Sequence, residues 1–483
     1  MEDAMSGPLR SRTLRACAAL AGAATLALSI PVMGHAATSS VRLYTGPMSA
    51  GVPTTWSDRG HYRSCPNPAP GQPFPTATPE EVGLDAGALQ EAANYHSQRL
   101  QETFWVVRFG CLVKTGNVNA LFDHTPKHQW SVTKAVSTAV LGRAVTLGYI
   151  GIEDTVGKYF PNLGDGAHRA ITVNQLLHHT QGTHMNWTRE FQLQNPDRLT
   201  EFASLPIEHQ PGTYFQYSQT GPAVLNAMVE KAVGEDFQKF AQDQLFTPLG
   251  IKRPNWYWMR DQAGNTEGYS LLHMRPLDMV TFGQFLLQSG SWAGRQLVDP
   301  QFYRDALRGS DSNPAFGYQT WVNAAPRHVT IALTSREQNN HCLVPSAPND
   351  MYMTWGWRGR HQFMMPNLGM MVVSTPFDHD FDYSLEDVHT FPGAQGEQGE
   401  GYHEFFRILM RAVRDQRIAD PGPWTYGGKA ATTYDAKNYV EPDQTVDSRS
   451  KPSAFEGKGV LQNLQDYPQT ALNPEAGPFV PFH

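Results

Sequence analysis

The stretch WSVTKAVSTAVLGRAVTLG, from Trp130 to Gly148, decides how the rest of the sequence is interpreted. Its apolar residues recur at helical spacing from Val132 onward, which predicts a helix buried on one face with Ser131 at its first turn. Lys134 follows Ser131 by three residues, and positions i and i+3 lie on the same side of a helix. The stretch therefore places a hydroxyl and an amine within reach of each other.

The Ser131 and Lys134 pair has the chemistry of an activated nucleophile. A serine hydroxyl is a poor nucleophile unless a base accepts its proton, and a lysine can be that base when desolvation lowers its pKa. The start of a helix also favours developing negative charge. Spacing alone is weak evidence, because Ser448 and Lys451 repeat it in a polar region. The first pair differs in having Trp130 before it and an apolar helix after it.

The run from Trp130 to Lys134 resembles the nucleophile motif of the class C β-lactamase-related serine hydrolases, a family that includes penicillin-recognising enzymes, esterases and 6-aminohexanoate-dimer hydrolase. Further segments resemble the family in the same order along the chain: Ile152–Val156, Tyr159–Pro161, Ile171–Gly182, Pro211–Gln219, Met274–Leu297 and Phe316–Tyr318. The resemblance extends from about Pro79 to Arg414. It implies a β-lactamase/transpeptidase-like fold.

Tyr217 and Gln219 lie where the family has its second catalytic motif, normally Tyr-x-Asn. A phenol near a lysine ammonium can lose its proton more easily and act as a general acid or base. A packed aromatic is the commoner role of a tyrosine, and the resemblance favours catalysis here. Gln219 replaces the usual Asn, and its extra methylene puts its role in orienting Lys134 or the substrate in question.

The third family motif, normally Lys-Thr-Gly or His-x-Gly, corresponds to Thr354-Trp355-Gly356, so only the glycine is retained. The resemblance implies an oxyanion hole formed by the backbone N–H groups of Ser131 and Trp357, with Gly356 letting the substrate approach the strand.

Three charged or titratable residues follow that motif, and they have two interpretations. Arg358, Arg360 and His361 either bind an anionic group of the substrate or are solvated charges at a strand edge.

The resemblance predicts an acyl-enzyme on Ser131 that water then cleaves, with Lys134 and Tyr217 as acid and base. The predicted substrate is a small molecule with an ester or amide bond, and no cofactor is required. One alternative is a β-lactamase or D-alanyl peptidase. Another is a non-catalytic binding protein of the same fold, because the second and third motifs are altered. A GxSxG nucleophile elbow is absent from the sequence, which argues against an α/β-hydrolase.

No metal site is predicted. His178, His179 and His184 lie close together in the sequence without a Glu-centred HExxH pattern, so structural roles are favoured. The alternating Asp378, Asp380 and Asp382 lack the glycine and glutamate that a calcium loop needs at its sixth and twelfth positions.

Residues 1–36 predict a signal peptide, with arginines before an apolar run from Ala16 to Ile30 and small residues before Ala37. That run is shorter than the roughly 20 residues that span a bilayer, so we expect cleavage, no stable membrane span and an exported protein, periplasmic or secreted. The formal net charge of −7 argues against a nucleic-acid partner. Cleavage would leave Cys65, Cys111 and Cys342, which allow at most one intramolecular bridge between an undetermined pair.

The sequence predicts four regions: the signal peptide, an irregular arm at 37–78, a hydrolase domain at 79–416 and a polar extension at 417–483 without its own core. Strand-forming segments on both sides of a mainly helical middle predict an α+β architecture, with an antiparallel sheet built from both ends of the domain and a helical subdomain. The expected helices are 86–99, 132–147, 173–178, 221–233, 236–245 and 277–289, and the expected strands lie within 104–113, 316–322, 351–363 and 370–374.

Overall fold

The computed structural model describes residues 40–48, 50–54, 61–100, 102–116, 119, 123–124, 126–185, 195–330, 336–356, 359–376, 397–425 and 431–433. The predicted signal peptide and most of the polar extension lie outside these residues. Among the helices that are described, none combines the length and the apolar character needed to cross a membrane.

An antiparallel sheet of six strands organises the domain, in the order β2-β1-β13-β12-β11-β8. Two of its strands come from the N-terminal part of the chain and four from the C-terminal part, which confirms the predicted architecture. The strands are β1 (Glu102–Arg108), β2 (Cys111–Thr115), β8 (Trp321–Val322), β11 (Tyr352–Gly356), β12 (Arg360–Met365) and β13 (Met370–Pro376).

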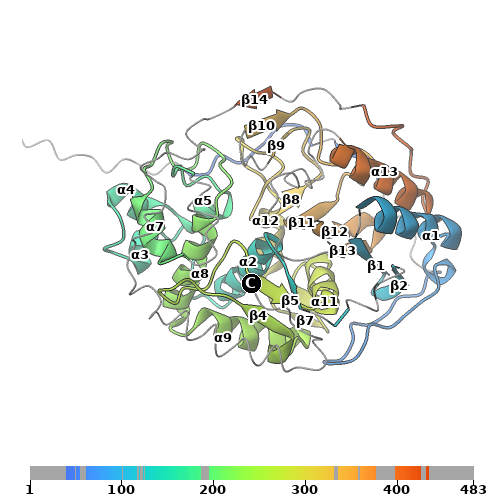
Figure 1. The fold of residues 1–483 in the computed structure, drawn as a ribbon, viewed down its shortest axis with the longest axis horizontal. Helices are drawn as coiled ribbons and strands as arrows, with labels where there is room; N and C mark the ends of the chain where they lie inside the picture. The colour runs from blue at the N-terminus through green and yellow to red at the C-terminus, as the bar shows by residue number, and fades with distance from the viewer. Residues whose placement is uncertain are drawn as a thin grey trace, which may run out of the picture. The chain divides into compact units, whose positions relative to one another are not determined.

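Alternating side chains of the sheet contribute to two apolar cores, because successive residues of a strand point to opposite faces. Trp105 and Val107 of β1 belong to the core that contains α2 (Val132–Thr146), α8 (Thr220–Val233) and α11 (Pro276–Leu287). Phe104 and Val106 belong to the core beneath α1 (Ala86–Tyr95) and α13 (Glu397–Arg411), which lie side by side in Figure 1. The helix that begins beside Ser131 is thus buried against the sheet.

The middle of the chain is mainly helical, as predicted. Its shorter helices are α3 (Val156–Tyr159), α4 (Gly166–Ala170), α5 (Val173–Leu177), α7 (Arg198–Ser204), α9 (Phe237–Ala241), α10 (Thr247–Leu249) and α12 (Pro300–Ala306). The structure also contains smaller sheets. One consists of β3 (Lys127–His128), β5 (Leu272–Met274) and β4 (Trp256–Trp258), and another of β6 (Ser291–Trp292) and β7 (Arg295–Gln296). A further sheet consists of β14 (Ala431–Thr433), β10 (Arg336–Asn339) and β9 (His328–Val329).

Most predicted elements occur, with two corrections. The Asp85 side chain caps α1 by accepting from the Ala88 N–H, and the hairpin turns at Gly110 as expected. Only Trp321 and Val322 of the predicted 316–322 strand are extended, since Gln319 has a φ of 50° in the left-handed region. The predicted 351–363 strand is two strands, because the chain turns at Gly359 with a φ of 80°.

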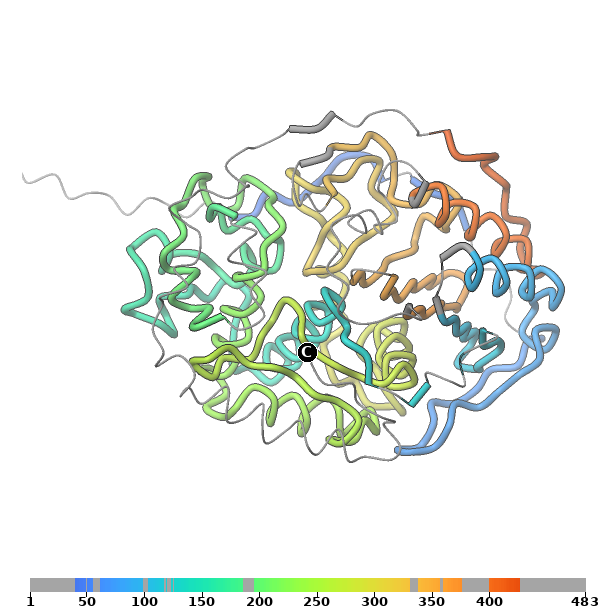
Figure 2. The backbone as a smooth tube through the Cα atoms, viewed as in Figure 1, coloured from blue at the N-terminus to red at the C-terminus, as the bar shows by residue number. Residues whose placement is uncertain are grey.

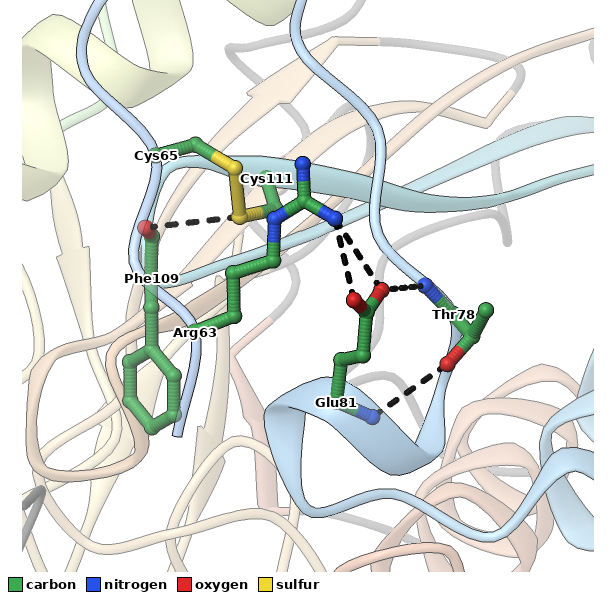
Figure 3. Close-up of a disulfide and its surroundings, with 6 residues drawn as sticks. All are labelled: Arg63, Cys65, Thr78, Glu81, Phe109 and Cys111. Atoms are coloured by element: carbon green, nitrogen blue, oxygen red, sulfur yellow. Dashed lines mark hydrogen bonds and ion pairs between the residues drawn. A yellow bond between two sulfur atoms is a disulfide. The ribbon is translucent and has the colours of Figure 1, made fainter. Parts of the chain in front are cut away.

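The arm follows the edge of the sheet and is covalently joined to it. Cys65 forms a disulfide with Cys111 at the start of β2 (Figure 3). The Cys65 N–H also donates to the Phe109 carbonyl. Thr76 pairs with Leu112 along the same edge, and Figure 2 shows the arm in blue passing beside this hairpin. The arm therefore protects an edge strand whose backbone groups would otherwise be exposed. The sequence left the pairing open, and Cys342 is the buried free thiol.

The described part of the polar extension contacts the domain. The Trp424 ring lies 5.5 Å from the ring of His341 and 5.4 Å from that of His403. Asp420 forms an ion pair with Arg407 of α13, and β14 adds a strand to β10. The described part of the extension, for which the sequence predicts no core of its own, therefore packs against the domain.

Candidate active site

Ser131 and Lys134 meet at the start of α2. The Lys134 Nζ lies 3.0 Å from the Ser131 Oγ, as the i, i+3 spacing predicts. Lys134 is only 1% exposed, whereas Ser131 is partly exposed, so the hydroxyl is the group that a substrate can reach. Trp130 precedes the pair with a φ of 45°, a conformation that costs a bulky residue energy and is typical of functional turns.

Two further oxygens hold the Lys134 ammonium. Gln219, at the start of α8, accepts from the Nζ through its Oε1 at 2.6 Å, and the Tyr269 carbonyl accepts at 2.9 Å. The longer Gln219 side chain therefore still reaches Lys134 in place of the family's asparagine. The Ser131, Gln219 and Tyr269 acceptors are all neutral oxygens.

Tyr217 completes the group. Its ring centroid lies 4.7 Å from the Lys134 Nζ. The sequence predicted that the nearby ammonium would ease loss of the phenolic proton, and this prediction is wrong in direction. Burial raises the pKa of Tyr217 above its ordinary value, and the influence of Ser131 opposes that shift only in part. Tyr217 accordingly holds its proton at neutral pH.

His179 fixes the backbone on both sides of Tyr217. Its carbonyl accepts from the Gln216 N–H at 2.9 Å, and its Nδ1 accepts from the Ser218 N–H at 3.0 Å. Burial, together with the charge of Lys134, holds the pKa of His179 well below its ordinary range, which keeps Nδ1 available as an acceptor. The sequence assigned His179 a structural role at most, and no spacing rule links it to Tyr217.

Gly356 ends β11 against the turn that precedes Ser131. A Cβ at this position would lie 2.6 Å from the Gln129 carbonyl oxygen and 3.2 Å from the Val132 side chain, so only glycine fits. Within the described residues no group accepts the Ser131 N–H, whereas the Val132 N–H donates to the Gln129 carbonyl. Trp357, whose backbone N–H is predicted to be the second donor of the oxyanion hole, lies outside the described residues.

The residue that opens the third motif carries no charge and is bonded internally. Thr354 shares its strand face with Gly356 and donates from Oγ1 to Gln362 Oε1 at 2.9 Å, while Gln362 in turn donates to the Met279 carbonyl of α11 at 2.6 Å. A neutral hydrogen-bonded chain therefore lies where penicillin-recognising relatives are expected to present a cation.

Of the charged or titratable residues after the third motif, Arg360 and His361 are buried, so the strand-edge interpretation is wrong for these two. Arg360 and His361 are each 1% exposed. Arg360 Nε donates to the His128 carbonyl, and His361 Nε2 lies 2.5 Å from the Tyr402 hydroxyl on the other face of the sheet. Both therefore have internal partners, and Arg358 lies outside the described residues.

A segment that sequence reasoning missed, residues 267–272, connects these parts. Besides the Tyr269 carbonyl on Lys134, the Leu271 N–H donates to His128 Nε2 at 3.0 Å and the Leu272 carbonyl accepts from the Gln129 N–H at 2.8 Å. The segment thus supports the lysine and the turn before the nucleophile together. These contacts are made mainly by the backbone, so residue identity gave little signal.

The histidines considered as metal ligands have protein partners instead. His178 places Nδ1 3.0 Å from the Asn174 carbonyl and Nε2 3.1 Å from the Arg308 carbonyl, and His184 Nδ1 lies 3.1 Å from a Glu208 oxygen. The described residues contain no cluster of three or more potential ligands, and the aspartates at 378–382 lie outside them.

The chain is similar to known proteins in sequence and in fold. The Beta-lactamase family model matches residues 119–351, which include Ser131, Lys134 and Tyr217. The N-acetylmuramyl-L-alanine amidase of Bacillus subtilis (strain 168) is 25% identical over 376 residues, covering 66% of this chain and 81% of the amidase. A structure named "Putative 6-aminohexanoate-dimer hydrolase from Bacillus anthracis" covers 74% of this chain and 92% of its own, with 17% identity and a TM-score of 0.53.

Another relative, named "Putative fimbrial assembly protein FimD, serogroup D" in Dichelobacter nodosus, is 31% identical over 27% of this chain, which spans only 34% of that relative's length. Together the comparisons confirm the predicted fold class and the resemblance to the β-lactamase-related serine hydrolases.

Proposed function

We propose that this protein is an exported serine hydrolase that cleaves a small open-chain ester or amide through an acyl-enzyme on Ser131. The observation that carries the proposal is the partly exposed Ser131 hydroxyl 3.0 Å from the amine of a buried lysine. The lysine is held by neutral acceptors, and a protonated tyrosine lies beside it. This combination has a nucleophile, a base and a proton donor in contact.

In the first half of the reaction the Ser131 Oγ attacks the carbonyl carbon while Lys134 in its neutral form accepts the hydroxyl proton. The resulting oxyanion is positioned to accept a hydrogen bond from the Ser131 backbone N–H. We expect the Trp357 N–H to be the second donor. Collapse of this intermediate breaks the bond to the leaving alcohol or amine. Because Tyr217 is protonated at neutral pH, it suits the role of the acid that protonates the leaving group.

In the second half, water attacks the carbonyl carbon of the acyl-enzyme ester on Ser131 and transfers a proton to the pair formed by Lys134 and Tyr217. The Ser131 oxygen recovers its proton as the carboxylic acid leaves. The closeness of Lys134 to Tyr217, 4.7 Å from Nζ to the ring centroid, supports return of the proton from the lysine to the phenol. The chain's own side chains complete the cycle.

The neutral Thr354 supports a preference for open-chain substrates over β-lactams. Its hydroxyl is bonded to Gln362, so the position lacks the cation that would bind a drug carboxylate. A charge-assisted hydrogen bond is about twice as strong as a neutral one. Export is supported by the N-terminal apolar run and by the disulfide, which is typical of oxidising compartments.

The decisive experiment is reaction of the full chain with a fluorophosphonate probe, followed by mass spectrometry of the labelled peptide. We expect a covalent adduct on Ser131 and loss of turnover in Ser131→Ala. Lys134→Ala and Tyr217→Phe should each lower turnover by at least about 100-fold, the scale of general acid-base catalysis. Ser448→Ala is the matched control, since it changes the other Ser-x-x-Lys pair. An unlabelled folded protein would favour the non-catalytic binding function.

The substrate class is tested by comparing kcat/KM for a p-nitrophenyl short-chain ester with kcat/KM for a chromogenic cephalosporin under the same conditions. We expect the ester to be preferred. If the cephalosporin is turned over at least ten times more efficiently, the inference from Thr354 is wrong and a β-lactamase is the better assignment.

A second candidate is a hydrolase of peptidoglycan amide bonds. It is favoured by the similarity to the Bacillus subtilis amidase over 81% of that protein's length. Release of amino sugars or peptides from purified peptidoglycan, with Ser131→Ala as the blank, separates this candidate from a small-molecule esterase.

A further inference from the structure

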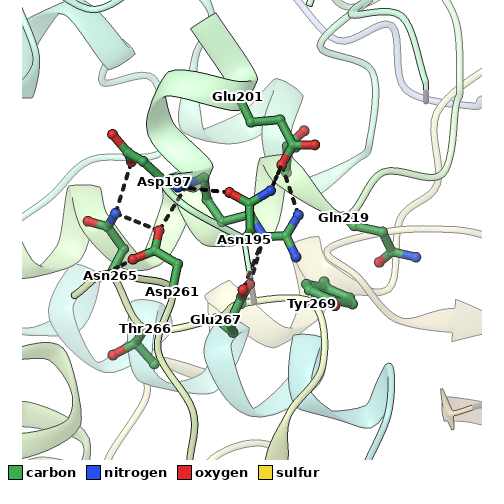
Figure 4. Close-up of polar contacts among 12 residues, drawn as sticks. Asn195, Asp197, Glu201, Gln219, Asp261, Asn265, Thr266, Glu267 and Tyr269 are labelled. Atoms are coloured by element: carbon green, nitrogen blue, oxygen red, sulfur yellow. Dashed lines mark hydrogen bonds and ion pairs between the residues drawn. The ribbon is translucent and has the colours of Figure 1, made fainter. Parts of the chain in front are cut away.

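A buried ion-pair cluster lies behind the Lys134 site. Arg198, at the start of α7, donates from Nε to both carboxylate oxygens of Glu267 at 3.1 and 3.0 Å, and from one terminal nitrogen to Glu201 at 2.8 Å. The backbone N–H of Arg198 donates to Asp261 at 2.9 Å. Figure 4 shows Glu201 of α7 close to Asp261 and Glu267, which belong to one loop. The side chains of Arg198 and Glu267 are completely buried.

Such a cluster contributes more to geometry than to net stability. Moving charges out of water is costly, so a buried ion pair often stabilises a protein less than an apolar replacement would. Once formed, however, it permits few arrangements, because displacing either partner leaves a buried charge without its counterion. Burial raises the pKa of Glu267 to about 7, and Arg198 opposes that rise. Arg198 thus favours the ionised form of Glu267 and holds its carboxyl group in place through the two hydrogen bonds from Nε.

The cluster is connected to Lys134 through two residues of backbone. Glu267 is also held by its carbonyl, which accepts from Trp258 Nε1 at 2.6 Å. Gly268 follows in a space where a Cβ would lie 2.1 Å from the Pro222 carbonyl oxygen. Tyr269 comes next, and its carbonyl accepts from Lys134 at 2.9 Å. The backbone from Glu267 to Tyr269 is therefore too constrained to absorb a shift of Glu267. Such a shift would displace the Tyr269 carbonyl that accepts from Lys134.

A second contact links the same groups through the Tyr269 ring. The Arg198 guanidinium carbon lies 4.9 Å from the ring centroid, and the Lys134 Nζ lies 5.5 Å from it. Figure 4 shows Tyr269 between Glu267 and Gln219, the other residue that bonds Lys134. A planar guanidinium can stack on a ring and pair with two carboxylates at once, which a lysine ammonium cannot do.

We propose that Arg198 is a positioning residue for Lys134: by fixing Glu267 and the Tyr269 ring, it holds the Tyr269 carbonyl against the Nζ and so directs the amine toward Ser131. The inference rests on the proposed function for its kinetic consequences. Its structural consequence, the hydrogen bond between Lys134 and the Tyr269 carbonyl, is independent of which substrate is cleaved.

The test compares Arg198→Lys with the wild-type full chain. We expect kcat to fall by at least about tenfold with KM changed less than about threefold, because the loss concerns the base and not substrate contacts. The pH at which the kcat profile reaches half its maximum should shift by at least about half a unit. A crystal structure of the variant should show the distance between Lys134 Nζ and the Tyr269 carbonyl lengthened beyond hydrogen-bonding range.

Arg108→Lys is the matched control. Arg108 of β1 is also completely buried and forms an ion pair with Asp415 at 2.7 Å. It also donates to the Leu368, Val82 and Gly83 carbonyls and belongs to a different part of the domain. This control should lose stability without a shift of the pH profile.

If Arg198→Lys does not fold, Glu267→Gln provides the same comparison with Asp415→Asn as its control. An unchanged bond between Lys134 and Tyr269, or kinetic losses no greater than those of the controls, would overturn the proposal. A wild-type chain without turnover or probe labelling would instead refute the proposed function, and the crystallographic distance would still decide the positioning role.

Discussion

Replacing Gln219 with asparagine, the residue usual at this position of the family motif, should lower activity. The Gln219 Oε1 lies 2.6 Å from the Lys134 Nζ, and a side chain shorter by one carbon–carbon bond of about 1.5 Å would place its oxygen near 4 Å, outside hydrogen-bonding range. A hydrogen bond to a charged group contributes about 1.5–3 kcal/mol. If that energy is lost where Lys134 acts, kcat/KM should fall about 10- to 160-fold, at about 1.36 kcal/mol per factor of ten.

The assay is kcat/KM of Gln219→Asn for the best ester found, with circular dichroism to confirm folding. Gln216→Asn is the control, because it makes the same chemical change in the same segment and the Gln216 amide contacts Met185 Sδ. Gln219→Leu should be at least as impaired as Gln219→Asn. Retention of kcat/KM within twofold by Gln219→Asn would refute the assigned role, since it would mean that the amide does not hold Lys134.

Three further predictions concern the supports of the site. Gly356→Ala should lower kcat about 100-fold, because a Cβ 2.6 Å from the Gln129 carbonyl displaces the turn before the nucleophile; stopped-flow acylation rates measure this, and an unchanged rate would contradict it. His179→Leu should lower kcat at least about tenfold whereas His179→Asn, which can still accept from the Ser218 N–H, should retain most of it; equal losses would exclude the hydrogen bond as the cause. The double variant Cys65→Ser/Cys111→Ser should lose about 4 kcal/mol of unfolding free energy in urea, since the bridge closes a loop of 46 residues, with kcat near that of the wild type.

The order of motifs in the sequence was sufficient to predict the fold class and the closeness of Ser131, Lys134 and Tyr217 in space. A buried helix beginning beside Ser131 follows from local periodicity, and the i, i+3 contact with Lys134 follows from helix geometry. Tyr217 was assigned through the resemblance, since no local rule relates residues so far apart in the chain. The structure brings all three together at the predicted place.

Tertiary contacts decided what these side chains do. The direction of the Tyr217 pKa shift was predicted wrongly, because the sequence shows a possible neighbour but not the loss of water around it. The same limit applies to Arg360 and His361, whose charges suggested a solvated edge until the structure placed them inside.

By itself, the sequence determined the elements whose signal is local along the chain: the nucleophile helix and the hairpin that turns at Gly110. Tertiary structure alone determined which cysteines pair, that Gln219 reaches Lys134, and that Arg198, Glu267 and the Tyr269 carbonyl lie behind the lysine. The physical reason is that these contacts join segments brought together by packing, often through backbone atoms that every residue carries. Periodicity records which side of an element is buried, and it does not record what that side touches.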